Sequence, residues 1–161
     1  MNFHMIQAVL IMVVCPVICF FIEYVKTKQL SYENGIKWIL FWTVGIRSVT
    51  AGLMQVVKPE YTAVYIFNMT GTEFYTIIRE LGIANFTIGL TAVFSLRIKN
   101  WRQPAAFTAC IFNLLLVINH CINFQAGINE LFSLIFDILV VVCTLPYVLS
   151  GLVRRGDTHR T

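Results

Sequence analysis

The sequence predicts an all-α membrane protein with five transmembrane helices. Hydrophobic residues make up 58% of the 161 residues and charged residues only 12%, whereas soluble domains average about 45–50% and about 25%. The mean hydropathy is +0.75. So few charges could not cover the apolar surface of a soluble fold of this size. Disordered, collagen-like and disulfide-scaffold proteins are excluded by the same composition.

Five apolar stretches approach the length that a bilayer needs, about 20 residues. We place them at about residues 5–22, 38–57, 72–96, 104–122 and 131–152 of a single integral membrane domain, 1–161, whose polar tail is 153–161. The first stretch has no basic region before it and no small-x-small cleavage site. It is therefore expected to be an anchor and not a removable signal peptide.

The basic residues predict the orientation of the chain. Only Lys58 lies in the second loop, and neither the N-terminus nor the fourth loop has any. Nine basic residues lie in the first loop, the third loop and the tail: Lys26, Lys28, Lys37, Arg97, Lys99, Arg102, Arg154, Arg155 and Arg160. Because cytoplasmic loops carry the excess of Lys and Arg, we expect the N-terminus outside and the C-terminus in the cytoplasm.

Polar residues recur at helical spacing on four of the five spans. They form four stripes: Thr43, Arg47, Ala51 and Met54; Glu73, Thr76, Glu80, Ala84, Thr87 and Thr91; Ala106, Ala109, Asn113 and His120; and Glu130, Ser133, Asp137 and Thr144. Ionisable residues inside a span usually face the bundle interior or a cavity. The sequence therefore predicts that spans two to five form a four-helix bundle around a polar interior, with the first helix peripheral.

Small residues form a second face on the third span, roughly opposite Glu80. This face consists of Gly82, Asn85, Gly89 and Ala92, and Ser48 and Gly52 offer similar spacing on the second span. Such faces let membrane helices approach closely. We expect close helix packing there.

The charged residues inside the spans predict a site in the outer half of the membrane. Arg47, Glu80 and Asp137 lie within their spans, and His120 lies at the outer end of the fourth. We expect Arg47 to pair with Glu80 or with Asp137, because an unpaired buried charge is costly. Two interpretations remain open: structural ion pairs, or a ligand or proton site built on the same residues. The two are compatible.

The segment 74–85 resembles the Glu-x-Gly-x-Ala-Asn core of a small, uncharacterised family of bacterial membrane proteins, which is similar to the four-helix DoxX-like proteins. The matching positions are Glu80, Gly82, Ala84 and Asn85, with Asn119-His120 and Gly45-Ile46-Arg47 as weaker matches, over roughly residues 40–150. DoxX-like proteins are associated with quinol-oxidase and other membrane redox assemblies, often as accessory subunits. The resemblance implies a bacterial plasma membrane protein. The additional first span departs from the four-helix plan.

Other chemistries find little support in the sequence. Cys121 adjoins His120, but neighbours on a helix point about 100° apart. No spacing typical of metal ligands and no nucleotide-binding motif occurs. No basic patch with interleaved aromatic residues indicates nucleic-acid binding. We therefore expect no metal and no catalytic residue, and we assign no cofactor.

The function that these observations favour is binding of a small amphipathic molecule, such as a lipid, a quinone or a hydrophobic metabolite, in an outward-opening polar pocket. The expected ligand-binding residues are Arg47, Glu80, Asn85, Asn113, His120 and Asp137. The expected partners are membrane lipid, this ligand, and either another membrane protein or a second copy. The alternatives are an accessory subunit of a membrane redox or transport complex, and a small membrane enzyme that uses Glu80 or His120 as acid–base.

Overall fold

The computed structural model describes residues 3–67, 69, 71–123 and 127–158, and these ranges contain helices and no strand. The first membrane-length rod consists of α1 (Phe3–Val9), η1 (Leu10–Val14) and α2 (Cys15–Thr27). The second rod consists of α3 (Tyr32–Trp38), η2 (Ile39–Ile46) and α4 (Arg47–Val57). A short connection follows with α5 (Pro59–Tyr61) and η3 (Thr62–Ile66). The remaining elements are η4 (Thr72–Phe74), α6 (Tyr75–Phe94), η5 (Lys99–Trp101), α7 (Arg102–Ile122) and α8 (Ile128–Thr158).

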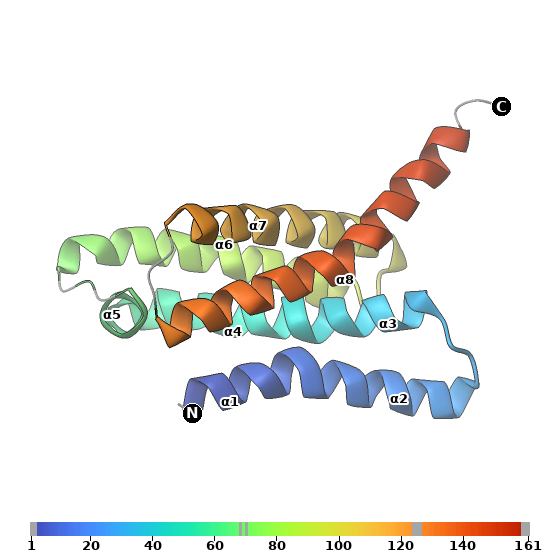
Figure 1. The fold of residues 1–161 in the computed structure, drawn as a ribbon, viewed down its shortest axis with the longest axis horizontal. Helices are drawn as coiled ribbons and strands as arrows, with labels where there is room; N and C mark the ends of the chain where they lie inside the picture. Colours follow the sequence, from blue (N-terminus) through green and yellow to red (C-terminus); the bar gives the residue numbers. More distant parts are fainter. Residues whose placement is uncertain (1–2, 68, 70, 124–126, 159–161) are drawn as a thin grey trace.

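Five of these rods are long and apolar enough to cross a membrane, as the sequence predicts. They comprise Ile6–Thr27, Tyr32–Val57, Thr72–Phe94, Lys99–Ile122 and Glu130–Val153. Successive rods run in opposite directions, so the N-terminus lies at one end of the bundle and the C-terminus beyond the other (Figure 1). We call these the amino-terminal end and the carboxy-terminal end. The chain is a multi-pass membrane protein.

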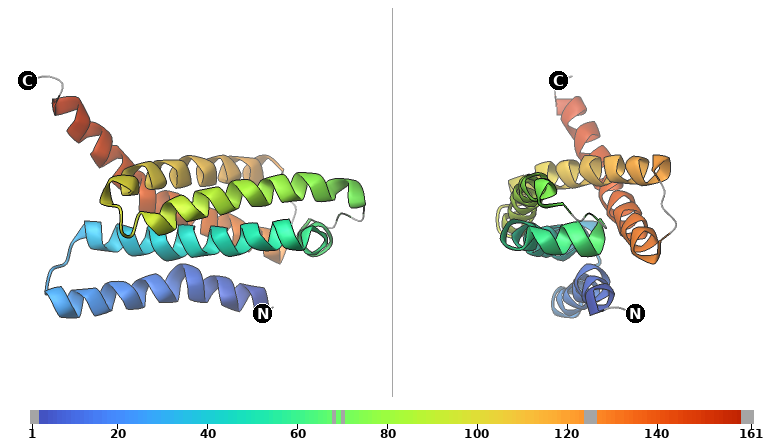
Figure 2. Two further views of the ribbon diagram at one scale, coloured as in Figure 1. Left: turned by 180° about the vertical axis from the view of Figure 1, so that it is seen from behind. Right: turned by 90° about the vertical axis from the view of Figure 1, so that its left-hand side faces the viewer.

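The first rod lies at the edge of the bundle, as predicted. It runs along the second rod and away from α6 and α7 (Figures 1 and 2). Met12 and Pro16 are its buried residues in the part of the chain whose side chains are described, while Val17 and Phe21 are largely exposed. An apolar rod exposed over most of its surface is suited to contact with lipid.

The first two rods extend several residues toward each other beyond the ranges predicted. Glu23 explains the extension, because its carboxylate pairs with Lys37 and accepts a hydrogen bond from the Trp38 indole at 2.6 Å. Polar groups at these helix ends are thereby satisfied between the rods, and the helical backbone continues through them.

The second and third rods pack through glycines, which confirms the predicted small-residue contact. A Cβ added to Gly52 would lie 2.5 Å from the Gly82 carbonyl oxygen, and one added to Gly89 would lie 2.6 Å from the Val49 backbone nitrogen. Only hydrogen fits at such distances, so α4 and α6 approach backbone to backbone. Asn85 strengthens this contact by donating to Gln55 Oε1 at 2.9 Å.

The other pair of rods, α7 and α8, packs closely before the last turns of α8 (Figure 1). Ala105, Ala106 and Ala109 of α7 are buried against the interior, together with Phe136 and Val140 of α8. α8 also contains Pro146, which has no N–H to bond the carbonyl one turn earlier. The last turns of α8 lead away from the bundle (Figure 1).

Candidate functional site

Asp137 is the most buried ionisable side chain among the candidate residues. Phe136, Asp137, Val140 and Thr144 recur at helical spacing on the face of α8 that is turned to the interior. Asp137 is 1% exposed. A carboxylate at that depth needs a partner, because burial of an isolated charge is strongly unfavourable.

Arg47 is the partner that the second rod supplies. It is the first residue of α4 and directly follows the π-helical segment η2. Its Nη2 lies 3.4 Å from Asp137 Oδ1, and its side chain is 33% exposed. Of the two pairings predicted for Arg47, the one with Asp137 is formed.

His120 extends the contact to the fourth rod. Its Nε2 lies 3.6 Å from Asp137 Oδ2. Its Nδ1 lies 3.3 Å from Glu130 Oε1 at the start of α8. The imidazole therefore stands between two carboxylates. We call Arg47, His120, Glu130 and Asp137 the charged cluster; it joins α4, α7 and α8.

Glu130 belongs to this cluster although it was not among the expected ligand-binding residues. The sequence carried the signal for it. Glu130 lies two helical turns before Asp137 on the same predicted stripe of α8, so the same face brings both carboxylates to His120.

Asn113 faces the interior from α7, as its stripe predicted. It is 4% exposed, and its Nδ2 donates to the Ala109 carbonyl oxygen at 2.8 Å. Its Oδ1 is buried without a hydrogen-bond partner in the described structure. An unsatisfied buried acceptor is unusual and costs about 1–3 kcal/mol.

Glu80 lies outside the charged cluster, and the prediction that it lines the interior is wrong. Its side chain is exposed and forms no ion pair with any residue that the structure describes. Glu80 is exposed because α6 packs on α4 through its opposite face, which carries Gly82 and Gly89. Because that face is turned to the second rod, Glu80 points away from it. Asn85, on the packed face, is used in the contact with Gln55.

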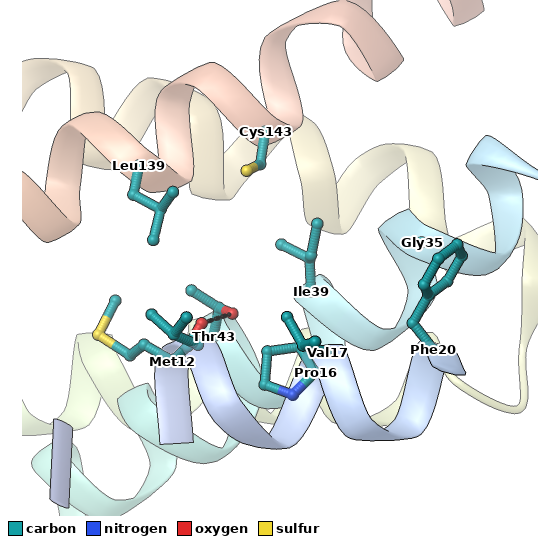
Figure 3. A pocket seen from close by; sticks show the side chains of 10 residues that line it. Met12, Pro16, Val17, Phe20, Gly35, Ile39, Thr43, Leu139 and Cys143 are labelled. Carbon is teal, nitrogen blue, oxygen red and sulfur yellow. Dashed lines mark hydrogen bonds between the residues drawn. The ribbon is translucent and has the colours of Figure 1, made fainter. Parts of the chain in front are cut away.

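An apolar cavity of about 300 Å³ lies between the first rod, the second rod and α8 (Figure 3). Its lining residues are Met12, Val13, Pro16, Val17, Phe20, Gly35, Ile39, Thr43, Leu139 and Cys143. Leu139 and Cys143 point into it from α8, opposite Pro16 and Val17 (Figure 3). The Thr43 hydroxyl donates to the Met12 carbonyl oxygen at 2.9 Å, so the cavity wall presents few free polar groups.

The cavity and the charged cluster are connected through the second rod. Thr43 of the cavity precedes Arg47 by about one turn on that rod, whereas Leu139, two residues after Asp137, points to a different side of α8. The sequence did not predict this apolar space. Apolar side chains look the same in a sequence whether they pack against each other, face lipid or line a cavity.

A second, polar cavity of about 270 Å³ lies toward the carboxy-terminal end, beside Glu33, Gln103 and Tyr147. Arg102, 7% exposed, lies 3.5 Å from Glu33 and donates to the Ser95 carbonyl oxygen at 3.2 Å. The loops there are thus tied together. Among the residues that the structure describes, no group of three His, Cys, Asp or Glu side chains is placed to hold a metal ion.

Comparison with known proteins gives a family. Residues 6–161 match the model of a family of unknown function (DUF6790), and the chain belongs to that family. No curated protein and no solved structure matches the chain.

Proposed function

We propose that this member of the family binds a small amphipathic molecule, whose polar head lies at the charged cluster and whose apolar part enters the cavity behind the first rod. The observation that carries the proposal is the adjacency of the two features on the second rod: Thr43 lines the cavity about one turn before Arg47 of the charged cluster. Ligand sites are typically apolar with a few convergent polar groups.

The charges of the cluster favour a particular head group. Arg47 contributes one positive charge, Glu130 and Asp137 contribute two negative charges when ionised, and His120 can add one proton. The sum is zero or negative, which disfavours a phosphate or a carboxylate. A neutral head with carbonyl or hydroxyl groups fits better, because Arg47 can donate to its oxygen and the carboxylates of the cluster can accept from its hydroxyl. Quinones and neutral lipids have such heads.

We place the protein in a bacterial plasma membrane with the N-terminus outside. The support is the distribution of Lys and Arg and, for the bacterial membrane, the resemblance noted above. In this orientation the charged cluster lies in the outer half of the membrane and the apolar cavity deeper. A ligand would stand with its head outward, like a lipid of the outer leaflet.

The direct test is to identify what the purified protein carries. Protein isolated in mild detergent would be extracted with organic solvent, and the extract analysed by mass spectrometry. We expect a neutral amphipathic compound enriched over bulk membrane lipid. Cys143→Phe, which fills the cavity, should abolish that enrichment, whereas Cys121→Phe, at an exposed position of α7, should leave it intact. Equal recovery of the compound from both variants would disprove binding in the cavity.

A subunit role in a larger membrane redox or transport complex is the second candidate. Arg79 and Glu80 favour this role, because both are exposed within the third span and charged side chains there are less costly against a neighbouring protein than against lipid. The resemblance to DoxX-like proteins points in the same direction. Native purification separates the two candidates, because a subunit should co-purify with larger membrane proteins in fixed stoichiometry.

A further inference from the structure

The outer face of α6 carries a regular series of side chains that no other helix covers within the described part of the chain. Figure 2, left, shows α6 in front of α7 and α8 and beside the second rod. Six residues spaced alternately four and three apart form this face, which we call the α6 seam: Thr76, Glu80, Ile83, Thr87, Leu90 and Phe94. All but Leu90, which is half-buried, are exposed. A four–three spacing is the pattern by which two helices pack side by side.

Two opposite charges lie on this face within the membrane. Arg79 and Glu80 are seven and eight residues from Thr72, where the third span begins, or about 11 and 12 Å along the helix. Both side chains are exposed, and neither forms an ion pair within the described part of the chain. Ionisable groups at such depth are costly when they face acyl chains. Glutamate is also too short to reach the interface from there.

We infer that the α6 seam is the contact with a second copy of this chain. Copies in one membrane share one orientation, so a two-fold axis along the membrane normal sets each residue opposite residues of equal depth. Arg79 and Glu80 are consecutive and flank the line through Thr76, Ile83 and Thr87 on either side. Arg79 of each copy then meets Glu80 of the other, and two reciprocal ion pairs form.

The rest of the seam suits the same contact. Thr76 and Thr87 are small, and the Thr87 hydroxyl already donates to the Ile83 carbonyl oxygen at 2.8 Å. Ile83, Leu90 and Phe94 continue the face toward the carboxy-terminal end. None of these residues belongs to the charged cluster or to the cavity. The inference therefore stands independently of the proposed ligand.

Disulfide crosslinking tests the geometry. Ile83→Cys, at a seam position 59% exposed, should give a disulfide-linked dimer on mild oxidation in native membranes. Ile77→Cys is equally accessible, at 65% exposed, but lies about 120° from Ile83 around α6 and should stay monomeric. The protein with only its native cysteines gives the background level of crosslinking. Equal dimer from both variants, or capture of a different protein by the seam cysteine, would overturn the inference.

Charge reversal tests the reciprocal pairs. Arg79→Glu alone or Glu80→Arg alone sets like charges against each other across the contact and should weaken the dimer at least about tenfold. The double variant, which carries both substitutions, restores both ion pairs and should restore the dimer. Dimer fraction would be measured by subunit counting or energy transfer in liposomes at varied dilution. A native chain that is monomeric in the bilayer, or a double variant no better than the single ones, would refute the second-copy contact.

Discussion

At the scale of single residues, the Arg47–Asp137 pair shows which part of an ion pair can be predicted from the sequence. Three charged residues on predicted interior stripes left two pairings open, Arg47 with Glu80 or with Asp137, and the structure forms the second. Stripes on α7 and α8 predicted the interior positions of Asn113, His120 and Asp137 correctly. The stripe of α6 failed because that helix has two candidate contact faces. Periodicity defines the faces of a helix, but it does not say which neighbour each one meets.

The pair gives the first prediction. Arg47→Ala leaves the buried Asp137 with His120 as its remaining charged neighbour, and we expect a loss of about 3 kcal/mol of stability. Adding Asp137→Asn removes the uncompensated charge and should recover part of the loss. Adding Glu80→Gln should recover none, because Glu80 lies elsewhere. Thermal unfolding in detergent measures all three. Strictly additive losses for Arg47 and Asp137 would argue against the pair.

Asn113 gives a prediction that separates stability from binding. Its unpaired Oδ1 is expected to cost stability in the ligand-free protein. Asn113→Leu removes that acceptor at similar volume and should raise stability by about 1 kcal/mol. Asn113 lines neither the cavity nor the charged cluster, so the same variant should keep the co-purifying compound. A lower melting temperature or a loss of the compound would contradict these expectations.

At the scale of helices, the glycine contact between α4 and α6 fixes the architecture. The sequence indicated it through small residues at helical spacing, and the structure places Gly52, Gly82 and Gly89 in direct backbone contact. This contact decides which side of α6 is left for Glu80. One set of glycines therefore determines both the packing of the bundle and the exposure of the α6 seam.

Substitution of these glycines tests the contact. Gly52→Ala would set a methyl group 2.5 Å from the Gly82 carbonyl oxygen, so α4 and α6 must move apart. We expect a loss of at least about 2 kcal/mol. Gly35→Ala is the matched control, since its Cβ would lie 3.8 Å from Phe20 Cε2 and alanine favours the helix by up to about 1 kcal/mol. Equal melting temperatures for the two variants would mean that the helices do not meet at Gly52.

At the scale of the whole molecule, five spans and a peripheral first helix follow from hydropathy and from the absence of a polar stripe on the first span. The cavity behind that helix does not follow from either. Its volume depends on how far the first rod stands from the second rod and α8, and π-helical segments lie in both of the first two rods. Such wider turns alter the course of a helix without any signal in hydropathy.

Orientation in the membrane is the last property that the whole chain determines. Among the side chains that the structure describes, two basic residues on the expected cytoplasmic side are paired, Lys37 with Glu23 and Arg102 with Glu33. If these two paired residues are not counted, seven basic residues remain on the expected cytoplasmic side, against Lys58 alone on the other side. Acidic residues contribute little to this bias, so the expected orientation is unchanged.

Cysteine labelling of intact cells tests that orientation. A membrane-impermeant thiol reagent should label a cysteine introduced at position 2 and leave one at position 158 unlabelled until the cells are opened. Exposed Cys121 would be replaced by serine to reduce background labelling. Labelling of position 158 from outside would reverse the orientation. The charged cluster, which lies toward the amino-terminal end, would then belong to the cytoplasmic half of the membrane, and its ligand would be drawn from the inner leaflet.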